Sequence, residues 1–293
     1  MRLSILNFFS TPFEAIGLAE QCDGLGYHRF WVGEHHSRGQ IPDALAFAMV
    51  AAGSTARIRL GTGAVSLVFR NPHLIAESAI TAELFFPGRI DLGVTKAAAV
   101  DSESRARLTA GSDMAWVLEH YPERLRALRD ILTREDPAPE LFLRESVPLG
   151  PAMHVMVTNT ERARATGEMG LGLVASFHHG GTEDGIADMV AAYREHFTPS
   201  ALFAEPSAIV VVSGLVSDAL DVRAAAVVAE QELATSAGIF PRSVVVIGAA
   251  DEAAARIREL GQRTRADEMM FLCLSRGCET CYAELARGWG LTA

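Results

Sequence analysis

An acid and two imidazoles follow an apolar run near the start of the chain. Residues 30–36 read FWVGEHH, so Glu34, His35 and His36 come directly after four apolar residues. A short apolar run is typical of a buried strand. The polar residues that follow it either meet solvent or enter an active site. Histidine has an ordinary pKa near ~6.5 and can hold or transfer a proton at neutral pH. We predict that these three residues are catalytic, with a pair of surface or packing histidines as the alternative.

Other chemically able side chains also follow apolar runs. His178 and His179 follow the run 171–177, and Lys96 follows the run 89–94. Four of the nine histidines therefore fall at the ends of two runs, which scattered surface residues would not favour. The predicted substrate pocket combines this second histidine pair with two aromatic residues at strand ends, namely Phe8, Phe177, His178 and His179.

Eight apolar runs alternate with helical patterns along the whole chain, which predicts strands joined by helical crossovers. The predicted strands cover residues 2–8, 29–33, 58–67, 89–94, 153–157, 171–177, 208–213 and 268–274. Helical crossovers require parallel pairing, and strands that are apolar throughout are covered on both faces. We predict one α/β domain over residues 1–293, a (β/α)8 TIM-like barrel. Residues 97–111 are predicted as a loop and 135–151 as irregular. In such a barrel the chemistry lies where the strands end.

Composition limits the partners. The chain has 293 residues, of which 49% are hydrophobic and 21% charged, with a formal net charge of −10. This acidic balance argues against nucleic acid or an anionic membrane as partner. No window has the ~20 apolar residues of a membrane span. Four cysteines in so long a chain do not predict a disulfide framework, and we expect a cytoplasmic protein.

Three stretches carry a family resemblance. They read GYHRFWVGEHHS (26–37), RLGTGAVSLVFRNPHLIAES (59–78) and PGRIDLGV (87–94), and they resemble the bacterial-luciferase-like flavin-dependent monooxygenases. GEMGLGLVASFHH (167–179) and ADEMMFLCL (266–274) fit the sixth and eighth strand regions of that family. The resemblance implies a bacterial luciferase-like barrel that takes reduced FMN from a separate reductase. With molecular oxygen it would oxygenate a small organic substrate, in secondary metabolism or another biosynthetic pathway. It also implies a homodimer built on the helices predicted at 43–54 and 72–86.

The resemblance assigns roles to single residues. His35 matches the catalytic histidine beside the flavin, Glu34 matches the acid near it, and His36 completes the catalytic set. Gly63 and Ala64 lie where the family places a non-proline cis peptide behind the flavin ring. Lys96 stands where the family has an arginine for the FMN phosphate. The turn after the fifth strand, which cradles that phosphate in the family, here offers Thr158, Asn159, Thr160 and Arg162.

Lysine lacks the fork of arginine and the turn is altered, so three alternatives stay open. The first is a flavin-independent or non-catalytic relative. The second is a deazaflavin-dependent oxidoreductase of the same superfamily. The third is a metal-dependent barrel hydrolase, suggested by the histidines at the ends of strands two and six. The expected site contains no metal.

The cysteines have competing interpretations. Cys273, Cys278 and Cys281 have the spacing C-x4-C-x2-C, which occurs in iron–sulfur sites, but a fourth ligand would have to be Cys22. Cys278 and Cys281 could form a redox pair at a helix start. We expect buried, inert thiols.

Overall fold

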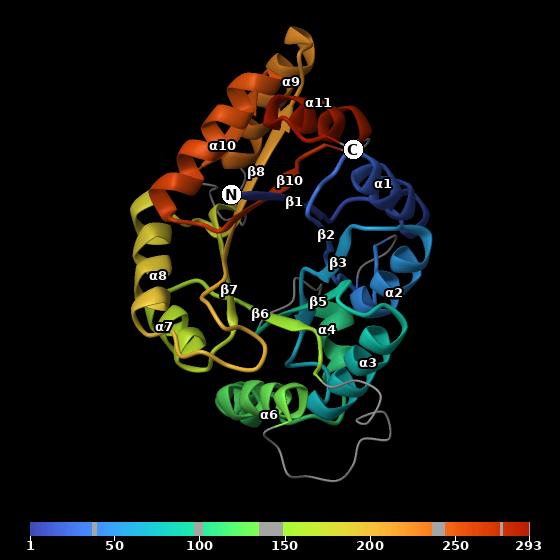
Figure 1. Ribbon diagram of the computed structural model, residues 1–293, viewed down its shortest axis with the longest axis vertical. Coiled ribbons are helices and arrows are strands. Elements are labelled where there is room, and N and C mark those ends of the chain that lie inside the picture. The colour runs from blue at the N-terminus through green and yellow to red at the C-terminus, as the bar shows by residue number, and fades with distance from the viewer. Residues whose placement is uncertain (37–39, 97–101, 135–148, 236–243, 276–277, 293) are drawn as a thin grey trace.

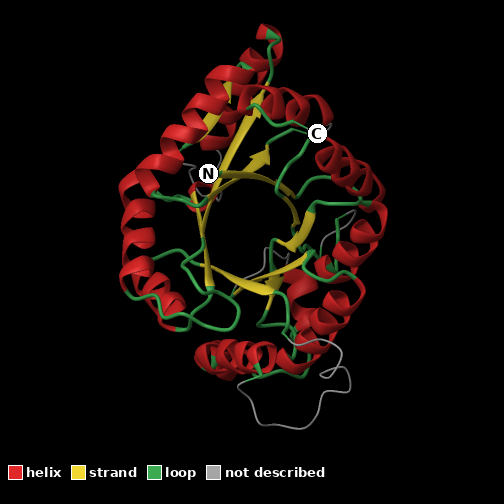
Figure 2. Ribbon diagram, in the orientation of Figure 1, coloured by secondary structure: helices red, strands yellow, loops and turns green. Residues whose placement is uncertain are grey.

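The computed structural model describes residues 1–36, 40–96, 102–134, 149–235, 244–275 and 278–292. Its parallel strands form a ring at the centre of the molecule, and helices surround this ring on the outside (Figures 1 and 2). The order of hydrogen-bonded strands is β1-β2-β3-β5-β6-β7-β8-β10, and β10 pairs with β1 again, which closes the barrel. The predicted (β/α)8 barrel is confirmed.

The strands are short, and every pairing between them is parallel. The barrel strands are β1 (Arg2–Asn7), β2 (Arg29–Val32), β3 (Arg59–Thr62), β5 (Ile90–Thr95), β6 (Ala152–Met156), β7 (Gly172–Ser176), β8 (Ala208–Val216) and β10 (Glu268–Cys273). Two further strands extend the ring, namely β4 (Val65–Ser66) beside β5 and β9 (Val245–Gly248) beside β8.

The helices cover the outer face of the barrel. They are α1 (Pro12–Gly24), α2 (Ala44–Ser54), α3 (Pro72–Phe85), α4 (Ser102–Leu108), α5 (Met114–Glu119), α6 (Tyr121–Thr133), α7 (Thr160–Glu168), α8 (Glu183–Glu195), α9 (Leu220–Thr235), α10 (Ala250–Thr264) and α11 (Glu279–Trp289), with a 3-10 turn η1 (Phe177–His179) after β7. Asp43 caps α2 as expected, since its side chain accepts hydrogen bonds from the N–H groups of Leu45 and Ala46. None of the helices within the described ranges is both long and apolar enough to span a membrane.

Three local predictions differ from the structure. The third predicted strand, 58–67, is split into β3 and β4, with a cis peptide bond between Gly63 and Ala64 separating them. The predicted loop 97–111 contains α4, a short helix whose polar sequence has no apolar stripe to reveal it. Phe177 belongs to η1 instead of the preceding strand. Of the stretch predicted as irregular, 135–151, residues 135–148 lie outside the described residues.

Large inward-facing side chains fill the barrel, and glycines make room for them. The inner cluster is apolar and consists of Leu6, Trp31, Val174, Ile209, Val211, Met270 and Leu272. A Cβ atom on Gly61 would overlap the indole ring of Trp31, and one on Gly93 would overlap the carbonyl oxygen of Thr62. The glycines of β3 and β5 are therefore a requirement of interior packing.

A buried ionic cluster closes the amino-terminal end of the barrel. Arg29 contacts both Asp91 and Glu268, and its Nε lies 2.8 Å from the Asp91 carboxylate. Arg59 makes two hydrogen bonds to Asp91, at 2.7 and 2.8 Å, and Ser4 donates to Glu268. The cluster joins β1, β2, β3, β5 and β10 at the end opposite to the predicted active site.

Candidate active site

Glu34 follows β2 and is almost completely buried, with 4% of its surface exposed. Its Oε2 atom lies 3.1 Å from Nη2 of Arg70, and its Oε1 atom lies 3.4 Å from Nε2 of His36. The backbone N–H of Ser66 donates to the same Oε1 at 3.3 Å. Burial raises the pKa of Glu34, while Arg70, the Ser66 N–H and His36 act in the opposite direction. The end of β2 therefore holds a carboxylate between cationic or protonatable groups.

Arg70 is a site residue to which the sequence analysis gave no role. Its Nη1 lies 3.2 Å from Asp43, the residue that caps α2, while its Nη2 faces Glu34. The carbonyl oxygen of Arg70 also accepts a hydrogen bond from Arg124 at 2.6 Å. One arginine thus connects the end of β2 with the start of α2. It lies in a motif that resembles the family, but spacing alone does not reveal this long-range pairing.

His35 is oriented differently from its neighbours. Its backbone N–H donates to the carbonyl of Ile41 at 2.9 Å, and its ring packs edge-on against Phe8, with centroids 5.0 Å apart. A Cβ atom on Gly33 would overlap the Phe8 ring, so this glycine lets the ring lie over the end of β2. His36 instead packs against Phe69 and faces Glu34. The structure therefore brings Glu34 and His36 together and places His35 beside Phe8.

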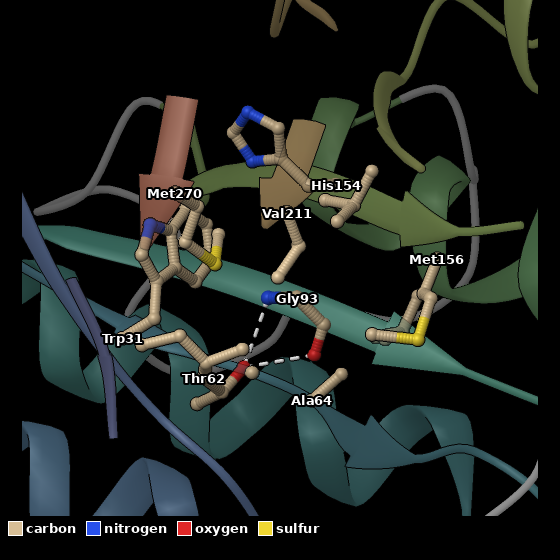
Figure 3. A pocket seen from close by; sticks show the side chains of 12 residues that line it. Trp31, Thr62, Ala64, Gly93, His154, Met156, Val211 and Met270 are labelled. Carbon is tan, nitrogen blue, oxygen red and sulfur yellow. Dashed lines mark hydrogen bonds between the residues drawn. The ribbon is translucent and has the colours of Figure 1, made fainter. Parts of the chain in front are cut away.

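A narrow cavity lies inside the barrel, and Gly63 and Ala64, which are joined by a cis peptide bond, form part of its lining. Figure 3 shows side chains from several strands around it, and its lining is apolar apart from Thr62 and His154. The Thr62 hydroxyl donates to the Gly93 carbonyl at 2.8 Å and accepts from the Gly93 N–H at 2.9 Å. These two bonds hold the end of β3 against β5, directly before Gly63.

His154 is a second residue that the sequence analysis did not single out. It is fully buried on β6, lines this cavity and packs edge-on against Trp31 and Phe203. Neither ring nitrogen has a hydrogen-bond partner among the residues that the structure describes. Burial and the nearby Arg29 lower the pKa of His154 to about 3, so its imidazole is neutral at pH 7. An isolated histidine in an apolar run carries no signal of this position.

Lys96 and Arg162 approach the same tyrosine. The Lys96 Nζ lies 5.6 Å from the centroid of the Tyr121 ring, at the start of α6. Burial raises the pKa of Tyr121 to about 12, and the charge of Arg162 acts to lower it. No ion pair of Lys96 or Arg162 occurs within the described ranges, and the Tyr121 hydroxyl is buried there without a hydrogen-bond partner. We call Lys96, Tyr121 and Arg162 the cationic subsite. Tyr121 was not anticipated, because only the fold brings α6 beside β5.

The exposed turn before α7 adjoins this subsite. Thr158, Asn159, Thr160 and Arg162 are all exposed. The side chain of Asn159 accepts a hydrogen bond from the N–H of Arg162 at 2.9 Å and so caps the helix. A helix N-terminus carries partial positive charge and favours an anion. In the first turn of α7, Arg162 adds a positive charge and Glu161 a negative one.

The end of β7 holds the other predicted histidines. His178 lies 2.9 Å through Nδ1 from the hydroxyl of Ser213, an inward-facing residue of β8 that was not anticipated. His178 is half-buried and His179 is exposed, so both can meet a ligand at this end of the barrel. Phe177 is fully buried in the packing between barrel and helices, and is not among the residues that line the cavity in Figure 3.

This arrangement combines groups for proton transfer with groups for anion binding. Glu34, His35 and His36 follow β2, while Lys96 and Arg162 follow β5 and β6. Within the described part of the chain, no three histidine, cysteine, aspartate or glutamate side chains converge as metal ligands. The geometry suits an organic ligand that carries an anionic group.

Comparison with known proteins identifies the family. The family model described as luciferase-like monooxygenase matches residues 9–279. A protein of Escherichia coli (strain K12) named luciferase-like monooxygenase is 30% identical over 207 residues, which cover 70% of this chain and 60% of that protein. The chain thus matches about 60% of the length of this relative.

Solved structures agree with this match. Apo-MsnO8 superimposes with a TM-score of 0.82 at 25% identity, covering 99% of both chains. Two more distant structures share the fold. The oxygenating constituent of 3,6-diketocamphane monooxygenase of Pseudomonas putida, in complex with FMN, has a TM-score of 0.67 at 18% identity, covering 98% of this chain and 95% of that one. An F420-dependent secondary alcohol dehydrogenase has a TM-score of 0.74 at 15% identity, covering 98% and 97%.

The closed parallel barrel, the acid and histidines after β2, and the family match over most of the chain lead to one conclusion. This chain belongs to the luciferase-like monooxygenase family.

Proposed function

We propose that the protein is an FMN-dependent monooxygenase that takes reduced flavin from a separate reductase and uses molecular oxygen to oxygenate a small organic substrate. The family is one of monooxygenases, and one structure of the same fold is a complex with FMN. The cationic subsite is the main support for FMN, because FMN carries a phosphate. Lys96 lies near the Tyr121 ring, and Arg162, in the first turn of α7, acts on the same tyrosine, so the two residues offer two positive charges for a dianionic phosphate.

The residues present fit the cofactor. Lys96, Arg162 and the turn at Thr158, Asn159 and Thr160 would hold the phosphate. Gly63 and Ala64, which line the narrow cavity at the end of β3, would back the ring. Reduced flavin would supply the electrons that activate oxygen. This chain would provide binding, orientation and exclusion of water.

The proposed roles of the acid and histidines follow from their contacts. His35, half-buried beside Phe8, would hold or donate a proton at the reacting centre. Glu34 would keep His36 oriented through their 3.4 Å contact. His178, His179 and Phe8 would contact the substrate, with Ser213 fixing one ring nitrogen of His178. We further propose that the protein acts in the cytoplasm and in a biosynthetic pathway.

A titration with FMN and with riboflavin, followed by flavin fluorescence, tests this proposal. The protein should bind FMN more tightly than riboflavin, which lacks the phosphate. Replacing one charged phosphate contact, in Arg162→Ala, should weaken FMN binding by about tenfold, or ~1.4 kcal/mol, and leave riboflavin binding unchanged. Arg164→Ala is a matched control, because Arg164 lies on the same helix and pairs with Glu168 at 2.8 Å.

Failure of the wild-type protein to bind FMN in either redox form would contradict the proposal. Preferential binding of an F420-type deazaflavin would instead favour the oxidoreductase alternative, which the likeness to an F420-dependent dehydrogenase supports.

A further inference from the structure

The fold gathers all four cysteines of the chain at one place. Cys22 comes from α1, Cys273 ends β10, and Cys278 and Cys281 stand at the start of α11. All four are free thiols and each is at most 4% exposed. Each of them acts to raise the pKa of the same phenol, that of Tyr282 on α11. Three separate elements therefore meet in a thiol cluster that the proposed flavin chemistry does not use.

Three of these sulfur atoms share a small network. The Cys278 thiol donates to the carbonyl oxygen of Ser275 at 2.9 Å, and the Cys273 sulfur lies 3.9 Å from that same oxygen. The Cys273 sulfur also lies 3.3 Å from the Ser275 hydroxyl. Cys281 contacts Cys273 as well, but its sulfur accepts a hydrogen bond from the N–H of Val216 at 3.3 Å. The sulfurs of Cys273 and Cys278 thus both lie within 3.9 Å of one backbone carbonyl oxygen.

The network indicates that two of these thiols can react with each other. These sulfurs do not form a group of metal ligands within the ranges that the structure describes. The neighbouring Cys278, Cys281 and Ser275 lower the pKa of Cys273, whereas the nearby Cys273 and burial raise the pKa of Cys278. Among the three, Cys273 is therefore the expected nucleophile and Cys278 the proton-bearing partner.

We propose that Cys273 and Cys278 are a modification site, at which hydrogen peroxide forms a reversible disulfide between the end of β10 and the start of α11. This inference does not depend on the proposed flavin function. The oxidant must be small and uncharged, because none of the sulfurs is more than 4% exposed.

The reaction balances in two steps. The Cys273 sulfur attacks one peroxide oxygen, so that an S–O bond forms and the O–O bond breaks. The departing hydroxide takes the thiol proton and leaves as water. The Cys278 sulfur then attacks Cys273, the S–S bond forms, and the S–O bond breaks with loss of a second water. The two thiols lose two electrons in total, and the peroxide gains them.

Burial also determines which product forms. A sulfenic acid that meets a neighbouring thiol condenses to a disulfide before a second peroxide can oxidise it further. Bulky disulfide reagents cannot reach a sulfur that is almost completely covered. We therefore expect oxidation by peroxide, no reaction of the folded protein with a bulky aromatic disulfide, and complete reversal by dithiothreitol.

Peptide mapping of the whole protein tests the site. The protein is treated with hydrogen peroxide, its remaining thiols are alkylated, and it is digested with trypsin. Cleavage after Arg265, Arg276 and Arg287 separates Cys273 from Cys278 and Cys281. The expected product is peptide 266–276 joined to peptide 277–287 with Cys281 alkylated, lighter by two hydrogen atoms than the sum of unmodified 266–276 and of 277–287 alkylated at Cys281 alone. Unlinked, fully alkylated peptides, or sulfinic acid at Cys273, would overturn the proposal.

Variants identify the partner. Cys278→Ser should abolish the linked product, while Cys281→Ser should retain it. Cys22→Ala is the matched control, since this residue is equally buried but lies on α1, and it should also retain the link. Loss of the link in Cys281→Ser but not in Cys278→Ser would refute the assigned pair. Mapping of the wild-type protein stays decisive even if a variant fails to fold.

Discussion

At the scale of single residues, neighbours in the sequence have separate tasks. Glu34 and His36 lie on the same side of the chain and contact each other, while His35 points to Phe8. Glu34 is buried and held by Arg70, so its contacts position His36 and the end of β2. His35 is half-buried and its ring packs against Phe8, which suits a residue that exchanges a proton with a ligand.

The role of His35 predicts a specific loss. His35→Ala should reduce oxygenated product from a panel of small aldehydes, ketones and activated aromatic compounds by about 100-fold or more, the usual size of a general acid–base contribution. Flavin binding should be retained. His73→Ala is the control, because His73 is exposed on α3 and pairs with Glu77. Undiminished product formation in His35→Ala would refute the role.

The lowered pKa of the buried His154 predicts that the stability of the fold depends on pH. Its pKa is lowered from 6.5 to about 3 in the folded protein. Between these values the unfolded chain binds a proton that the folded chain does not, so stability is full above pH 6.5 and falls as the pH drops toward 3. In His154→Phe this loss should be smaller, by about 1 kcal/mol per pH unit.

Urea denaturation between pH 7 and pH 4 measures this difference. His28 has a similarly lowered pKa but is present in both proteins, so it cancels in the comparison. Equal slopes of unfolding free energy against pH in the two proteins would show that His154 is not held neutral.

At the scale of elements, the strand ends and the helices behind them build the site jointly. The cationic subsite needs β5 for Lys96, α6 for Tyr121 and α7 for Arg162. The cis peptide between Gly63 and Ala64 separates β3 from β4, beside Ser66, whose N–H donates to Glu34. No single element contains the site.

The ionic cluster at the amino-terminal end predicts that substitution of Asp91 strongly destabilises the fold. Asp91 is fully buried, and Arg29 and Arg59 hold the pKa of its carboxyl well below its usual range. Asp91→Asn leaves both guanidinium groups without a charged partner at this position, and we expect a loss of about 3–5 kcal/mol in unfolding free energy.

Urea denaturation at pH 7 tests this value. The control is Glu103→Gln, which removes an exposed i,i+4 pair with Arg107 on α4 and should cost less than ~1 kcal/mol. Similar losses in the two variants would contradict a stabilising role for the buried cluster.

Elements were predictable from the sequence where local pattern decides the structure. Each of the eight barrel strands appeared as an apolar run, because both faces of a parallel barrel are buried. The structure places Glu34 and His35 after β2, Lys96 after β5 and His178 after β7. Arg70, Tyr121, His154 and Ser213 were missed, because their contacts join residues far apart in sequence and no spacing rule encodes them. The helix α4 was missed because its exposed surface has no apolar period.

At the scale of the whole molecule, the two ends of the barrel differ in purpose. The amino-terminal end is closed by Arg29, Asp91 and Glu268, and the carboxyl end carries the candidate active site. Stability and chemistry are thereby separated, which allows the loops at the carboxyl end to vary without loss of the barrel.

We propose that the protein is a homodimer that pairs through α2 and α3. These helices expose three large apolar side chains, Val50 at 57%, Leu74 at 61% and Phe85 at 69%. Leu74→Glu should place a charge in this interface and shift the mass measured by light scattering from dimer to monomer. Phe13→Glu is the control, because Phe13 is 87% exposed on α1 and should leave the dimer intact. A monomeric wild-type protein would refute the interface.

A crystal structure of the protein soaked with FMN will show whether the carboxyl end of the barrel binds this cofactor. We expect the phosphate in contact with Lys96, Arg162 and the start of α7. We also expect a ring that lies against Gly63 and Ala64 with His35 at its edge. A phosphate bound away from Lys96 and Arg162, or a ring bound outside the barrel mouth, would contradict the proposal.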